Sequence, residues 1–86
     1  MLEVTVGGSS ASLLGELADR GLVVKLETFD KAHHGQHWHL GFERRPGVLE
    51  MTDLGDACLL KVASNRDGGW ATALVEELSR TRPVDR

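Results

Sequence analysis

Apolar and polar residues alternate in short runs over the middle of the chain, and turn-forming residues separate these runs. Trp38, Leu40 and Phe42 alternate with polar residues or glycine, which is typical of a strand that buries one face. The segments 44–47 and 53–56 contain the proline, glycine and aspartate residues that favour turns. The predicted strands of this antiparallel meander cover residues 37–43, 48–52 and 57–63.

Apolar residues at helical spacing predict two helices, over residues 10–20 and 70–80. Serines at the start of the first helix can cap it, and Gly21 can end it. Two further strands are predicted over 2–6 and 22–29, one on each side of the first helix. The predicted order of elements is therefore β-α-β-β-β-β-α.

This order predicts an α+β fold in which two helices cover one face of a mostly antiparallel sheet of four to five strands. Such an arrangement is a two-layer sandwich, because each amphipathic element must bury its apolar side against another. The length of 86 residues suits one core. We expect a single compact domain over residues 1–82 and a frayed tail over 83–86, and the sequence leaves the strand order open.

Composition narrows the function classes. With 41% hydrophobic residues and a net charge of −3, the chain is typical of a globular protein with scattered basic residues, so nucleic acid is an unlikely partner. Its apolar stretches are far shorter than the roughly 20 residues of a membrane span. One cysteine and no basic leader favour a reducing compartment, and we expect a cytoplasmic location.

The register of the meander follows if both turns are four-residue loops. Phe42 then faces Leu49, and Met51 faces Cys58, so that the apolar residues share one face. A slip by one residue would place apolar residues opposite polar ones. Cys58 is therefore predicted to be a core thiol, neither a nucleophile nor a metal ligand.

The opposite face of the meander is predicted to carry His37 and His39. In the same register Thr52 lies directly across from His39, and Glu50 lies diagonal to it. Residues 33–39 contain all four histidines of the chain. The histidines are the one local anomaly in its composition.

Two histidines at positions i and i+2 of a strand project side by side and can hold one transition metal ion. The candidate ligands are His37 and His39, with His33 or His34 from the preceding loop and Glu50, or alternatively Asp30, as a carboxylate. No cofactor is expected by default, and the one that the histidines would suit is zinc or another transition metal. Alternatively, these histidines form an exposed polar surface, or one that responds to pH, because free imidazole titrates close to neutrality.

Partner contacts are the other candidate site. Trp70 opens the second helix, and Arg44 and Arg45 lie in a turn. These residues are candidates because aromatic and arginine residues are favoured at interface centres. Val48 and Leu59 on the outer face could be buried by self-association, so a homodimer is predicted.

Residues 7–12 join a strand to a helix, but they lack the motif of a phosphate-binding loop and are expected to serve as turn and cap. No catalytic set assembles, which favours a non-enzyme. The leading hypothesis is a noncatalytic binding or regulatory module that acts through protein contacts. The competing hypothesis is a metal-binding protein, including a metal-assisted enzyme.

Overall fold

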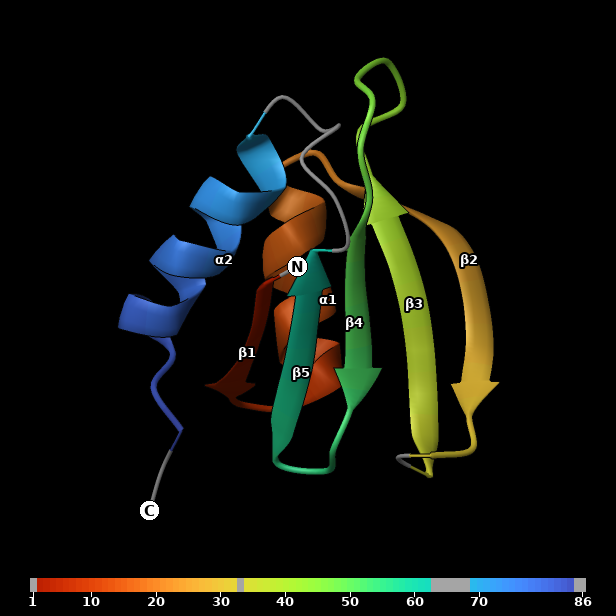
Figure 1. The fold of residues 1–86 in the computed structure, drawn as a ribbon, viewed down its shortest axis with the longest axis vertical. Helices are drawn as coiled ribbons and strands as arrows, with labels where there is room; N and C mark the ends of the chain where they lie inside the picture. Colours follow the sequence, from red (N-terminus) through yellow and green to blue (C-terminus); the bar gives the residue numbers. More distant parts are fainter. Residues whose placement is uncertain (1, 33, 63–68, 85–86) are drawn as a thin grey trace.

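The computed structural model describes residues 2–32, 34–62 and 69–84 of the chain. It confirms the α+β class and the predicted order of elements (Figure 1). The elements are β1 (Leu2–Gly7), α1 (Ser10–Asp19), β2 (Val23–Asp30), β3 (Gly35–Gly41), β4 (Leu49–Asp53), β5 (Ala57–Val62) and α2 (Trp70–Thr81).

The five strands form one antiparallel sheet in the order β1-β5-β4-β3-β2. Strands β2 to β5 make the predicted meander, and β1 pairs with β5 at the far edge. The helix α1 therefore connects the two edge strands, β1 and β2, which lie at opposite sides of the sheet (Figure 1). The strand pairings settle the strand order that the sequence left open.

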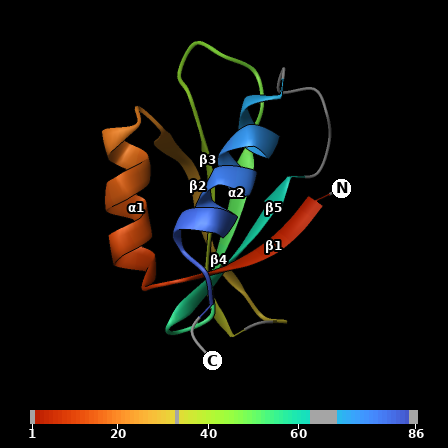
Figure 2. The same cartoon turned by 90° about the vertical axis from the view of Figure 1, so that its left-hand side faces the viewer.

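One face of the sheet, called here the covered face, forms a single hydrophobic cluster with both helices. Figure 2 shows α1 on one side of the strands. The covered face contributes Val6, Trp38, Leu40, Leu49, Met51, Cys58, Leu60 and Val62, and the helices contribute Leu13, Leu17, Trp70, Ala71, Leu74, Val75 and Leu78. Neither helix of the described ranges is long and apolar enough to cross a membrane.

Local signals explain the bounds of α1. Ser9 caps its start by accepting a hydrogen bond from the backbone N–H of Ser12 at 3.2 Å. At its end Gly21 has φ +93° and donates to the Ala18 carbonyl, while Leu22 donates to the Leu17 carbonyl. These two bonds are the Schellman pattern, which requires the left-handed conformation that glycine adopts readily.

The hairpin registers differ from the prediction by two residues. Leu40 pairs with Leu49, and Met51 pairs with Leu60, so Leu49 does not face Phe42 and Met51 does not face Cys58. The predicted covered face is nevertheless correct, because side chains alternate with a period of two and a two-residue shift preserves the face.

The lengths of the two connections explain the shifts. Phe42 leaves the β3 ladder and packs edge-on against Trp70, with ring centroids 4.9 Å apart, which widens the β3–β4 loop. The indole N–H of Trp70 donates to the Pro46 carbonyl in the same loop at 2.8 Å. The β4–β5 hairpin is tighter than predicted, because the backbone N–H of Leu54 donates to the Ala57 carbonyl at 2.9 Å.

Charged residues join α1 to the segment that follows α2. The Arg82 guanidinium donates to Glu16 at 2.8 Å and to the Ser12 hydroxyl at 3.1 Å. Arg20 donates to both Glu16 and Glu77. The hydrogen bond from Arg82, more than that from Arg20, lowers the pKa of Glu16. Of the predicted tail, residues 85 and 86 lie outside the described residues.

Candidate metal centre

The face of the sheet opposite the cluster, called here the open face, carries the two strand histidines. His39 pairs across the β3–β4 ladder with Glu50, and His37 pairs with Thr52. The sequence-based register had Thr52 opposite His39 and Glu50 diagonal to it, and the two-residue shift corrects both. The correction brings the carboxylate directly alongside the imidazoles.

Three potential ligand atoms form a compact triangle on this face. The Nε2 atoms of His37 and His39 are 3.2 Å apart, and Oε1 of Glu50 lies 3.3 Å from the first and 3.6 Å from the second. Atoms bound at 2.0–2.2 Å to a tetrahedral zinc ion are about 3.3–3.6 Å from one another. The triangle therefore has the size that one zinc ion requires, and we call it the His–His–Glu triangle.

A hydrogen bond orients one of the imidazoles. Nδ1 of His37 lies 2.7 Å from Oγ1 of Thr52, and Thr52 is only 2% exposed. When Nδ1 carries the proton and donates it to this hydroxyl, Nε2 keeps its lone pair and faces the triangle. Supporting bonds of this kind fix the ring and the tautomer of histidines that bind metals.

The triangle is partly shielded from water. The side chains of His37, His39 and Glu50 are 16%, 32% and 20% exposed. All three belong to paired strands, so their backbone positions are fixed by the ladder and not by a loop. Sites on regular elements hold their geometry better than sites on loops.

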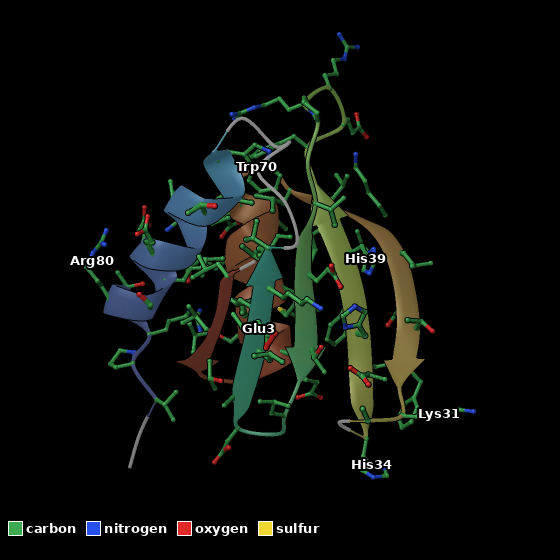
Figure 3. The ribbon with its side chains drawn as sticks, viewed as in Figure 1. Glu3, Lys31, His34, His39, Trp70 and Arg80 are labelled. Carbon is green, nitrogen blue, oxygen red and sulfur yellow. The ribbon has the colours of Figure 1, made fainter. Side chains whose placement is uncertain are left out.

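The other predicted ligands lie elsewhere or are not described. His34 is exposed at the β2–β3 turn with φ +55°, and Figure 3 shows it at the end of this hairpin, well apart from His39. Residue His33 is outside the described residues. The Asp30 carboxylate, which the sequence offered as an alternative ligand, accepts a hydrogen bond from the backbone N–H of Ala32 at 2.9 Å.

The residues predicted for partner contacts gather around the β3–β4 loop. Arg44 and Arg45 are exposed there, and the Arg45 guanidinium lies 5.0 Å from the centre of the Phe42 ring. Trp70 is only 9% exposed. Its indole ring is largely covered by this loop, so the two arginines are the more accessible part of the group.

Cys58 is buried on the covered face, as predicted. Burial, with a smaller effect of the Asp53 charge, raises the pKa of its thiol to about 11. The thiol is therefore protonated at neutral pH and a poor nucleophile. It also faces away from the His–His–Glu triangle, which leaves the triangle without sulfur.

A pocket of about 410 Å³ lies on the open face beside the triangle. His37 and Glu50 line it together with Lys61, which pairs with Glu50 across the β4–β5 ladder. Lys61 was not predicted as a site residue. A correct register for the β4–β5 hairpin would have revealed it, because it places this lysine directly beside the carboxylate.

Comparisons with known proteins supply no relative to set beside this geometry. No protein-family model matches the chain, and no significant match was found among the curated proteins or among the solved structures.

Proposed function

We propose that this protein binds one divalent transition metal ion, zinc in the first instance, through His37, His39 and Glu50. The observation that supports this proposal is the His–His–Glu triangle, whose sides of 3.2, 3.3 and 3.6 Å match the spacing of zinc ligands. The Thr52 hydroxyl beside His37 adds the supporting hydrogen bond that metal-binding imidazoles usually have.

The donor set favours an open site over a closed structural one. Two imidazole nitrogens and one carboxylate oxygen suit zinc, and the same set with open positions also binds ferrous iron. Structural zinc sites usually have four protein ligands, whereas three leave a position for water or another molecule. The proposed metal would therefore be accessible to small ligands, as in a metal-assisted enzyme.

A metal-free explanation exists for the same geometry. One proton shared between the Nε2 atoms, with Glu50 nearby, would make the triangle a hydrogen-bonded polar cluster on the sheet. The two explanations differ in the amount of zinc that they expect the protein to bind. Only the metal proposal predicts that the untagged protein binds one equivalent of zinc.

Calorimetric titration with zinc chloride, at neutral pH and without chelating buffer, distinguishes the two. We expect one equivalent for the unmodified chain and a loss of at least about tenfold in affinity for His37→Ala, His39→Ala or Glu50→Gln. His34→Ala is the matched control, because that imidazole lies apart from the triangle, and it should bind like the unmodified chain. An unmodified chain that binds no zinc when zinc chloride is in excess would contradict the proposal.

Protein contact is the second candidate function, and the β2 edge of the sheet favours it. Val24, Leu26 and Phe29 are each about half exposed, at 50%, 49% and 55%, on an edge strand whose outer side pairs with no described strand. Exposed apolar edges are prone to pairing with another chain. We propose a cytoplasmic homodimer that pairs through β2. Sedimentation velocity should then show a dimer that Leu26→Lys converts to a monomer.

A further inference from the structure

The pocket on the open face adjoins the His–His–Glu triangle at two of its three residues. His37 and Glu50 contribute to the pocket wall, and so does Thr52, which supports His37. Three protein ligands leave at least one coordination position of a zinc ion free. A molecule in this pocket would therefore reach the metal directly, without displacing a protein side chain.

A lysine lies next to that free position. Lys61 pairs with Glu50 across the β4–β5 ladder and lines the same pocket. Side chains opposite each other on one face of a sheet have Cβ atoms about 4.5–5.5 Å apart. The ammonium group of Lys61 can therefore approach an atom that binds to the metal beside Glu50.

The sign of the charge in the pocket depends on the metal. Three carboxylates and two lysines line it: Glu3, Asp30, Glu50, Lys31 and Lys61. Without metal the wall has an excess of one negative charge, whereas a divalent ion gives it an excess of one positive charge. The loaded pocket therefore attracts anions, and the empty pocket does not.

The pocket also has an apolar part. Leu59 pairs with Thr52 across the ladder and lines the wall. Pockets for small molecules combine such apolar surface with a few placed polar groups, and 410 Å³ is near the lower end of their usual size range. A small organic molecule fits this description better than an inorganic anion.

We propose that the metal-loaded pocket binds a small organic carboxylate, whose oxygen coordinates the metal at its free position and pairs with Lys61. Its hydrocarbon part lies against Leu59. This inference rests on the proposed zinc site, and it adds the class of ligand that the site receives.

The test uses the full chain and proceeds in two calorimetric titrations. Zinc chloride is titrated first, and butanoate is then titrated into the zinc-loaded protein, with butanamide, acetate and phosphate as comparison probes. We expect butanoate to bind at one equivalent, more tightly than acetate or phosphate, and butanamide to show no binding. Butanoate should bind the zinc-free protein at least about tenfold more weakly, because the carboxylates then dominate the wall.

Two variants separate the parts of the proposal. Lys61→Met should keep its zinc affinity and lose about tenfold in butanoate affinity, since it removes a charge-assisted contact. Leu59→Thr should keep zinc and bring the affinities of butanoate and acetate closer together. Lys25→Met, on β2 and away from the pocket wall, is the control for loss of a charge.

The outcomes distinguish the two proposals. A protein that binds one zinc ion but no butanoate would overturn the carboxylate inference and leave the metal centre standing. Phosphate binding as tight as that of butanoate would overturn the organic ligand class. A protein that binds no zinc would overturn both proposals.

Discussion

The same strands build both faces of the sheet, yet different forces hold the side chains of each face. Met51 and Leu60 pair on the covered face and are fully buried, whereas their chain neighbours Glu50 and Lys61 pair on the open face and stay partly exposed. Burial of apolar surface fixes the covered face, and the alternation of the strands then sets the open face. The chemistry of the open face can therefore vary with little effect on the fold.

Substitution of neighbouring residues on β4 should show the largest difference between the faces. Met51→Ala removes a fully buried side chain and should lower the free energy of unfolding by about 3 kcal/mol, through lost burial and a cavity. Glu50→Gln should change it by less than about 1 kcal/mol in the absence of metal. Urea unfolding followed by circular dichroism measures both, and similar losses would mean that the open face also holds the fold together.

Zinc should reverse the comparison, because it adds stability through the open face alone. At a free zinc concentration of 100 times the dissociation constant, the free energy of unfolding should rise by about 2.7 kcal/mol. The gain should vanish in His39→Ala and persist in Lys61→Met. It should also shrink as the pH falls, since an imidazole must lose its proton to bind metal. A gain that persists in His39→Ala would place the zinc elsewhere.

The thiol of Cys58 tests the covered face at alkaline pH. Burial raises its pKa from 9.0 to about 11, so the folded chain favours the protonated thiol. The resulting contribution to the free energy of unfolding, on the order of 2 kcal/mol, is fully present below pH 9 and is lost as the pH rises toward 11. Lysines titrate in the same pH range, and they are common to both chains, so the difference in pH dependence between the unmodified chain and Cys58→Ala isolates the thiol. Parallel curves would mean that the thiol is not buried.

The smallest effect is expected from the charged residues that join the helices. The hydrogen bond from Arg82 lowers the pKa of Glu16 below its ordinary value of 4.5. The Glu16 carboxylate therefore adds to the free energy of unfolding above that pH, and this contribution is lost as the pH falls below it. Glu16→Gln should cost less than about 1 kcal/mol near neutral pH, since these side chains are partly exposed. Thermal unfolding at low and high salt measures the cost, which salt should reduce.

The sequence was sufficient to predict the elements and the covered face. Alternation at Trp38 and Leu40 and helical spacing at Leu13 and Leu17 depend only on local periodicity, and the structure confirms both. A local pattern also placed His37 and His39 together on the opposite face, where the register pairs them with Thr52 and Glu50.

Tertiary packing determined what the sequence could not predict. The register depends on the lengths of the loops, and Phe42 leaves the ladder to contact Trp70, which lies far away in the chain. For the same reason the direct pairing of His39 with Glu50 and the place of Lys61 beside Glu50 were missed. Two-residue shifts keep the faces but change every neighbour across the ladder.

Crystals soaked in zinc test the metal centre most directly, through an anomalous difference map recorded at the zinc absorption edge. We predict one strong peak at about 2.0–2.2 Å from Nε2 of His37, Nε2 of His39 and Oε1 of Glu50. A map without a peak between these three atoms, or with its strongest peak at His34, would contradict the account.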